Sequence, residues 1–189
     1  MQVERLNERE YASVPMHIEG CFLYRLYKPD SLSFSLKKEP IKPFGYIVDD
    51  ENPSAWSTFI SMRNFTMVGI REGGMPVAAM SLVHDNPTVR MLDGRKDVLL
   101  IWDLRVHPDY KRKGYGRALI GYARQRAKEL GVGHLRLETQ NTNPNALEFY
   151  LAMGFELIHI REHAYSHDSL QDAGAENEIM LVLNETLSR

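Results

Sequence analysis

The chain has 189 residues, of which 43% are hydrophobic and 25% are charged, a composition typical of globular proteins and not of disordered ones. A chain of this length buries about 70% of its unfolded surface on folding. The formal net charge of −2 argues against a nucleic-acid-binding protein that works through bulk charge. The longest apolar run, Val98–Trp102, is far shorter than the ~20 residues of a membrane span.

The cysteine content and the N-terminus indicate the setting in which the chain works. Cys21 is the single cysteine, which excludes an internal disulfide framework and a cysteine-based zinc cage. We expect it to be a small buried apolar residue. The first residues, MQVERLNERE, lack the apolar core of a secretory signal. We therefore expect a cytoplasmic setting and one domain over residues 1–189, with no membrane or nucleic-acid partner.

The first half of the chain is rich in prolines and loops. Short strands are predicted over Phe22–Tyr27 and Phe44–Val48, and a short helix over Ser54–Arg63 with Ser54 as its N-cap. Phe65–Arg71 and Met75–His84 have the pattern of a β-hairpin closed around Gly73-Gly74, a dipeptide that tolerates positive φ.

The second half has longer and more regular elements. Asp97–Val106 is apolar in both alternations, which predicts a strand covered on both faces. Gly114–Leu130 carries a helical apolar stripe that stops at Gly131. The remaining predicted elements are a strand over His134–Gln140, a helix with Asn143 as N-cap and Pro144 in its first turn that ends at Gly154, and strands over Phe155–Tyr165 and Glu178–Asn184. This order predicts a mixed α/β (α+β) class with a central sheet and helices on both faces.

A glycine turn separates the strand that ends at Val106 from the helix that follows. Gly114 and Gly116 let the chain turn tightly, and the helix start presents unpaired N–H groups and the positive end of its dipole. Four cations surround the turn: Lys111, Arg112, Lys113 and Arg117. Such a turn favours an anion such as a pyrophosphate, although a solvated charged loop has the same composition. The dinucleotide fingerprint fails because Leu119 replaces its third glycine, and a Walker loop fails because no Gly-Lys-Ser/Thr follows.

Three motifs in a fixed order make the chain similar to a known family. They are Val106-His107-Pro108, Lys111-x-x-Gly114-x-Gly116 and Asn143-x-x-Ala146-x-x-Phe149-Tyr150-x-x-x-Gly154-Phe155. Over residues 98–160 they resemble the GNAT superfamily of acetyl-CoA-dependent N-acetyltransferases. The resemblance implies a single GNAT-like domain whose mixed central sheet is splayed to hold acetyl-CoA, with 98–160 as the acetyl-CoA-binding core. Residues 1–60 do not match and are expected to form the acceptor side, and Lys111 departs from the family's more usual Gln or Arg.

The resemblance also implies which residues hold acetyl-CoA. Backbone groups of Leu104, Arg105 and Val106 would pair with its pantetheine arm, Asn143 would contact the arm, and Tyr150 would lie near the sulfur. The turn residues assigned to acetyl-CoA are Lys111, Arg112, Lys113, Gly114, Tyr115, Gly116, Arg117 and Ala118. The amides of all of these except Lys111 and Tyr115 would hold the pyrophosphate, and no metal is expected.

Acetyl transfer to an amine needs one group that takes a proton and one that gives a proton. Glu138 is a candidate base, with a strand-face glutamate balanced by Arg136 as the alternative. Asp103 is a second candidate base, with a structural hydrogen-bond acceptor as the alternative, because a carboxylate in an apolar strand needs a partner. Many relatives carry a glutamate where this chain has Trp102. Tyr150 is the candidate general acid, with packing on its helix as the alternative.

Two clusters outside these motifs are weaker candidates. His159, His163 and His167 recur at intervals of four, but no further ligand is evident, so we do not expect a metal site. Asp49-Asp50-Glu51 is interpreted as a solvated turn, with attraction of a cationic amine as the alternative.

The acceptor amine is less well defined than the reaction. Leu137-Glu138-Thr139-Gln140-Asn141 resembles a segment of streptothricin acetyltransferases, which favours a small, cationic amine. A protein N-terminus or lysine is the alternative acceptor. A non-catalytic acyl-CoA-binding regulatory module and a nucleotide-phosphate-binding protein are alternatives of other classes. The sequence leaves the oligomeric state open, with a homodimer as one option.

Overall fold

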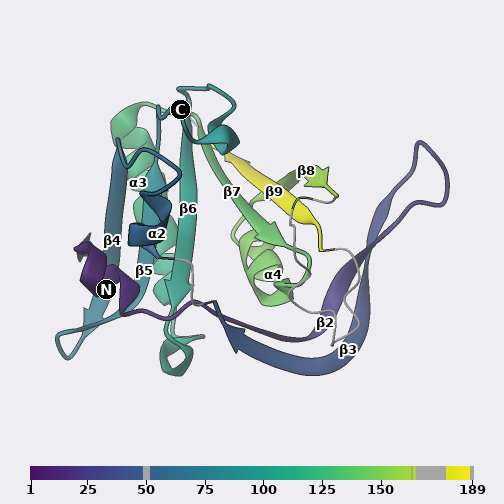
Figure 1. Ribbon diagram of the computed structural model, residues 1–189, viewed down its shortest axis with the longest axis horizontal. Helices are drawn as coiled ribbons and strands as arrows, with labels where there is room; N and C mark the ends of the chain where they lie inside the picture. The colour runs from purple at the N-terminus through teal and green to yellow at the C-terminus, as the bar shows by residue number, and fades with distance from the viewer. Residues whose placement is uncertain (49–51, 163, 165–177, 188–189) are drawn as a thin grey trace. The chain divides into compact units, whose positions relative to one another are not determined.

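The computed structural model describes residues 1–48, 52–162, 164 and 178–187 (Figure 1). The chain divides into two compact units. The first comprises Met1–His17, Ile47–Leu137 and Asn184–Arg189, and the second comprises Ile18–Tyr46 and Glu138–Leu183. Strands β7 (His134–Gln140) and β9 (Met180–Thr186) contribute residues to both units. That residues 1–189 form one folding domain is not tested by this division and stays a prediction.

The first unit is built around a sheet with the strand order β1-β4-β5-β6-β7. Its other elements are β1 (Glu4–Arg5), α1 (Glu8–Ala12), α2 (Pro53–Trp56), β4 (Phe65–Glu72), β5 (Met75–Val83), the 3₁₀ turn η1 (Arg90–Leu92), β6 (Val98–Val106), the 3₁₀ turn η2 (Pro108–Tyr110) and α3 (Tyr115–Leu130). β4, β5 and β6 pair antiparallel, whereas β6 and β7 pair parallel. The predicted mixed α/β class is therefore confirmed. The predicted β4–β5 hairpin is also confirmed, and Gly73 and Gly74 have positive φ at its turn.

β6 is the strand on which the two pairing modes meet. Its ladder with β5 extends to Val106↔Ala78 and shifts register between Ser81 and Leu82, where Asp103 and Ile101 are the partners. Trp102 is the extra residue of this bulge, which bends the strand locally. The ladder with β7 contains three residue pairs, from Val98↔His134 to Leu100↔Arg136. β6 therefore continues for six residues beyond its last pair with β7.

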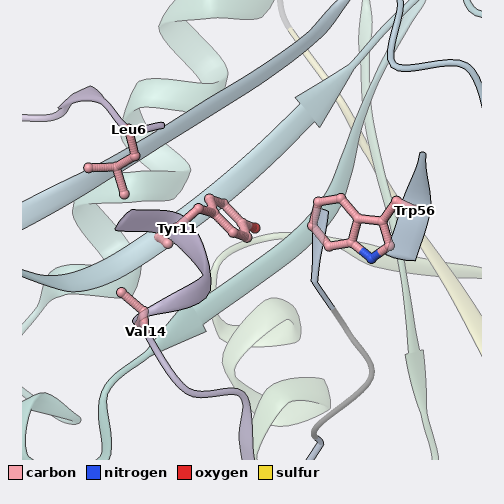
Figure 2. Close-up of a cluster of buried hydrophobic side chains, with 5 residues drawn as sticks. Leu6, Tyr11, Val14 and Trp56 are labelled. Carbon is pink, nitrogen blue, oxygen red and sulfur yellow. The ribbon is translucent and has the colours of Figure 1, made fainter. Parts of the chain in front are cut away.

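Helices cover both faces of the first unit's sheet, as predicted. On one face, α1 and α2 bury Tyr11 and Trp56 against Ala79 of β5, in a cluster with Leu6 and Val14 (Figure 2). The two aromatic rings meet edge to face with centroids 5.7 Å apart. α3 lies behind the sheet in the view in which α2 lies in front of it (Figure 1).

α3 follows the sequence prediction closely. Leu119, Ile120, Ala123 and Ala127 are buried, and their spacing of three or four places them on one face of the helix. The helix ends at Gly131, whose φ of 69° is left-handed and whose N–H donates to the carbonyls of Ala127 and Lys128. This is the geometry that favours glycine after a helix.

The predicted helix over Ser54–Arg63 is wrong in its start and its length. α2 begins one residue after Asn52, whose side chain accepts a hydrogen bond from the Ala55 amide, so Asn52 and not Ser54 is the N-cap. The helix is short because the hydroxyls of Ser57 and Thr58 donate to the carbonyls of Ser54 and Ala55. Such bonds compete with helix continuation.

The second unit contains β2 (His17–Tyr27), β3 (Ser35–Ile47), α4 (Pro144–Ala152) and β8 (Glu156–Arg161), with strand orders β2-β3 and β7-β9-β8. The two strands predicted before residue 50 are longer than expected. Pro40 and Pro43 suggested a loop, but β3 belongs to a two-stranded sheet, in which every strand is an edge strand that tolerates proline. β8 ends at Arg161, and the predicted strand end at Tyr165 lies outside the described residues.

Candidate functional site

The end of β6 extends beyond the described ladder with β7 in the first unit. Leu104, Arg105 and Val106 pair with β5 through Met80, Ala79 and Ala78. On the other edge, the described ladder with β7 stops at Leu100. A strand paired on one side only offers backbone donors and acceptors to an extended ligand on the other side. The three residues predicted to pair with a pantetheine arm are therefore placed on an edge that suits this role.

The glycine turn presents a row of backbone N–H groups at the start of α3. Arg112 and Gly114 both have positive φ, 65° and 90°, which curls the chain into the helix, and α3 has no side-chain cap. Among the described residues, the amides of 112–117 donate no hydrogen bond. Six N–H groups at the positive end of a 16-residue helix have the arrangement that favours an anion. The prediction for Ala118 is wrong, because its amide donates to the Gly114 carbonyl at 3.0 Å as the first bond of the helix.

Several side chains of the turn are engaged within the protein. Lys111 Nζ donates to the His17 carbonyl at 3.2 Å, and Lys113 Nζ donates to the Asp109 carbonyl at 2.8 Å. The Tyr115 hydroxyl donates to Glu72 Oε1 at 2.7 Å. This hydrogen bond, together with burial, raises the pKa of Tyr115 to about 12. These contacts hold the side chains of the turn, while the amides of 112–117 stay without a described partner.

Asp103 lies buried at the bulge of β6 and is held by two side chains. Its Oδ2 accepts hydrogen bonds from the Tyr11 hydroxyl at 2.6 Å and from Arg105 Nε at 2.7 Å. Arg105 Nη1 donates to the Val14 carbonyl at 3.3 Å, so the same network joins β6 to the α1 segment. The hydroxyl of Tyr11 and the guanidinium of Arg105 both bind the same carboxylate oxygen, as expected for a buried carboxylate that needs partners. This geometry favours the structural alternative for Asp103.

The other predicted catalytic residues belong to the second unit. Glu138 is half-buried on β7. Arg136, the proposed counter-charge in the alternative interpretation of Glu138, is engaged by Asp93 at 2.6 Å and by the Met91 carbonyl at 2.8 Å. Tyr150 is buried on α4, where its ring contacts Phe155 edge to face at 5.9 Å.

Asn143 precedes α4, as predicted, but its side chain does not cap the helix. Its φ of −112° and ψ of 65° differ from the extended geometry of a capping residue. Among the described residues, none accepts from or donates to the Asn143 side chain. The amide is therefore available to a ligand.

The sequence analysis missed the residues that fix the end of β7. Asn141 is buried, and it donates to the Tyr24 carbonyl at 3.0 Å and accepts from the Ile179 amide at 2.9 Å. The Thr142 hydroxyl donates to the buried carboxylate of Glu178. The run of polar residues directly after an apolar alternating strand is the signal that could have predicted them. Tyr11 was missed as well, because its partner Asp103 lies 92 residues away.

Of the weaker candidates, His159 and Cys21 lie among the described residues. Among the described residues, no three His, Cys, Asp or Glu side chains come together as a metal centre. His159 is exposed, whereas His163, His167 and Asp49-Asp50-Glu51 lie outside the described residues. Cys21 is exposed on the two-stranded β2–β3 ribbon, so the prediction of a buried cysteine is wrong. No helix in the described ranges is both long and apolar enough to cross a membrane.

Comparison with known proteins gives a family match and several relatives. The family model described as "Acetyltransferase (GNAT) family" matches residues 23–155. Streptothricin acetyltransferase of Streptomyces lavendulae is 46% identical over 57 residues, which are 30% of each chain. The ribosomal protein bS18-alanine N-acetyltransferase of Escherichia coli K12 is 35% identical over 78 residues, 41% of this chain and 53% of the relative. The chain thus spans about half or less of these relatives.

Solved structures extend the likeness in fold to nearly the whole chain. A nourseothricin acetyltransferase matches with a TM-score of 0.76 at 19% identity, covering 98% of this chain and 97% of its own. A Bacillus anthracis protein proposed to be a streptothricin acetyltransferase, in complex with acetyl coenzyme A, matches with a TM-score of 0.73 at 17% identity, covering 98% and 99%. The GNAT-like fold predicted from the sequence is confirmed.

Proposed function

Because the chain belongs to the acetyltransferase (GNAT) family, we propose that it transfers an acetyl group from acetyl-CoA to the primary amine of a small, cationic molecule. The observation that carries this proposal is the row of amides at residues 112–117, which donate no hydrogen bond within the described chain. They lie at the start of α3, where the helix dipole adds positive potential. The cytoplasmic setting expected from the single cysteine stays a prediction.

The first unit fits acetyl-CoA at two places. The amides of 112–117 suit the diphosphate, and the exposed side chains of Arg112, Lys113 and Arg117 add positive charge beside them. The edge of β6 at Leu104–Val106, which lies beyond the described ladder with β7, suits the amide groups of the pantetheine arm. Bound there, acetyl-CoA supplies an activated thioester.

The acceptor amine must lose a proton before it can attack. An amine with a pKa near 10.4 is neutral in roughly 1 part in 2,500 at pH 7, a deficit of about 4.6 kcal/mol. We assign acceptance of this proton to Glu138, which is half-buried on β7, directly or through water. Positioning the amine against the thioester lowers the activation barrier by more than the proton acceptor does, since effective molarities are worth about 7–11 kcal/mol.

We assign donation of a proton to Tyr150. Its phenol would protonate the leaving sulfur as the C–N bond forms and the C–S bond breaks. Tyr150 is buried on α4, where the contact of its ring with Phe155 helps to fix the position of the side chain. The side chain of Asn143, which makes no hydrogen bond with the described residues, would contact the pantetheine arm.

A small cationic acceptor is supported by the similarity to streptothricin acetyltransferase, which modifies a small molecule and gives 46% identity over its matched segment. The likeness in fold to nourseothricin acetyltransferase over 98% of the chain is consistent with it. A second candidate acceptor is a protein N-terminus, because the bS18-alanine N-acetyltransferase matches a longer segment at 35% identity.

A thiol-release assay with acetyl-CoA tests the proposal. The amines to compare are streptothricin, polyamines, aminoglycosides and a peptide with an N-terminal alanine, and we expect the highest kcat/KM with streptothricin or another small polyamine. Turnover with the alanine peptide alone would establish the second candidate. Coenzyme A binding without release for any amine would identify a non-catalytic acyl-CoA module, and competition by ATP would indicate a nucleotide-phosphate site.

A further inference from the structure

Two buried polar atoms at facing positions of β5 and β6 lack hydrogen bonds. Ser81 Oγ and Asp103 Oδ1 are both shielded from solvent, and neither is bonded to any residue that the structure describes. Ser81 has no exposed surface, and the Asp103 side chain is 5% exposed. A buried polar group without a partner is costly, so two of them side by side require a physical explanation.

The register of the strands brings these two residues together. Ser81 and Asp103 are Cα partners in the β5–β6 ladder, so their side chains leave the same face of the sheet. Side chains of directly paired residues have Cβ atoms about 4.5–5.5 Å apart. This spacing leaves both polar atoms near a single water molecule, which needs partners at about 2.7–3.0 Å and bonds well to a carboxylate and a hydroxyl.

The other oxygen of Asp103 is crowded with donors. Oδ2 accepts from Tyr11 and Arg105, and Arg105 Nη2 lies 2.5 Å away from it. The ring of Tyr11 stacks beneath the Arg105 guanidinium at 5.0 Å. One carboxylate oxygen is therefore saturated while the other lacks a donor. Among the described residues, Oδ1 is therefore the oxygen of this carboxylate that still lacks a donor.

We propose that Ser81 Oγ and Asp103 Oδ1 bind one buried water molecule, and that Asp103 is a positioning residue for the edge of β6 that holds acetyl-CoA. Asp103 directly precedes Leu104, the first of the three residues assigned to the pantetheine arm. Through Tyr11 and through the contact of Arg105 with the Val14 carbonyl, Asp103 ties this edge to the α1 segment. The proposal rests on the proposed acetyl-CoA site. It differs from a catalytic role for Asp103, since the carboxylate acts on the backbone that follows it.

The water is the occupant that the burial favours. The accessible area of both polar atoms is negligible, so an acceptor molecule does not reach them in this conformation, whereas a water molecule is the usual partner of buried polar groups that lack a protein partner. Its bonds would satisfy both groups and keep the carboxylate plane fixed. Fixing that plane keeps Arg105, and with it the strand edge, in one orientation.

The test compares the wild type with Tyr11→Phe, Ser81→Ala and Asp103→Asn. Asp85→Asn is the control for loss of a carboxylate, because Asp85 is half-buried after the end of β5 and its carboxylate faces Lys96 at 3.6 Å. High-resolution crystal structures locate the water, and calorimetry with coenzyme A gives Kd without any turnover. Steady-state assays give KM for acetyl-CoA separately from kcat. Tyr11→Phe retains the aromatic ring packed beside Trp56, so it reports on the network even where Asp103→Asn fails to fold.

We expect density for one water within hydrogen-bond distance of Ser81 Oγ and Asp103 Oδ1, and loss of that density in Ser81→Ala. Tyr11→Phe and Asp103→Asn should raise Kd and KM about twofold to tenfold, the effect of one lost hydrogen bond, with kcat nearly unchanged. Absence of water density between Ser81 Oγ and Asp103 Oδ1 in the wild-type crystal structure would refute the proposed water site. A fall in kcat of about 100-fold at constant KM would show Asp103 to be the base, and lower stability at constant Kd would show a purely structural role.

These outcomes separate this proposal from the proposed function. Failure of the wild type to acetylate any amine would refute acetyl transfer, while the water density and the coenzyme A Kd of the variants would still decide the role of Asp103. Absence of coenzyme A binding by the folded wild type would refute the site itself, and with it the positioning role.

Discussion

The hydroxyl of Tyr115 donates a hydrogen bond to Oε1 of Glu72 at 2.7 Å, which joins the first turn of α3 to the end of β4. The helix start that presents the free amides is thus anchored to the sheet by a side chain 43 residues away in sequence. The bond requires a protonated phenol, so the helix start depends on pH in the alkaline range.

The first prediction concerns how the stability of the protein depends on alkaline pH through Tyr115. The pKa of Tyr115 is raised from 10.0 to about 12 in the folded protein, by the hydrogen bond to Glu72 first and by burial second. The resulting stabilisation is fully present below pH 10 and is lost as the pH rises through 12. Urea unfolding between pH 9 and 12 should show a steeper fall in stability for the wild type than for Tyr115→Phe. Equal slopes would contradict the assignment.

The second prediction concerns the turn at Gly114. Its φ of 90° is costly for any residue with a Cβ, so Gly114→Ala should lose about 1–2 kcal/mol of stability and bind acetyl-CoA more weakly. Gly121→Ala is the matched control, because a Cβ at Gly121 meets no atom within 4 Å and the residue lies inside α3. The free energy of unfolding of this control should rise by about 0.5–1 kcal/mol, and its Kd for acetyl-CoA should stay unchanged. Calorimetry and urea unfolding measure both, and similar behaviour of the two variants would refute the role of the turn.

The third prediction concerns the proton donor. Tyr150→Phe preserves the ring that contacts Phe155 and removes the hydroxyl alone. If Tyr150 protonates the leaving sulfur, kcat should fall about 100-fold or more while the Kd of acetyl-CoA changes little. Steady-state kinetics and calorimetry report the two quantities. A weaker Kd with kcat preserved would assign Tyr150 to binding.

The fourth prediction concerns the end of β7. Asn141→Ala removes a buried side chain and leaves the Tyr24 carbonyl and the Ile179 amide without their bonds, which should cost about 1–3 kcal/mol. Asn145→Ala is the control, because Asn145 makes one exposed bond to the Glu19 carbonyl. Its cost should stay below about 1 kcal/mol by urea unfolding. Equal costs would show that burial of Asn141 contributes nothing.

Local chemistry explains which elements could be predicted from the sequence. α3 and the β4–β5 hairpin were predicted because the helical stripe and the glycines at 73, 74 and 131 act over a few residues. β3 was underestimated because the tolerance of Pro40 and Pro43 depends on its edge position, which is a property of the sheet.

In the candidate site too, local features could be predicted, whereas contacts between residues far apart in sequence could not. The glycine turn was predicted because one helix start creates it. The partners of Asp103 and Asn141 were not, because Tyr11 and Tyr24 lie 92 and 117 residues away from them in sequence. The incorrect roles of Ser54 and Ala118 both arose at helix starts, where a shift of one or two residues decides which group caps or donates.

The prolines of β3 have a consequence for how copies of this chain behave in concentrated solution. Pro40 and Pro43 are three residues apart, so in a regular strand they fall on opposite sides, and one of them faces outward from the two-stranded ribbon. Without an N–H at that point, an incoming strand from another molecule cannot build an uninterrupted ladder along β3. The prolines therefore disfavour the addition of a strand from another molecule to the outer edge of β3.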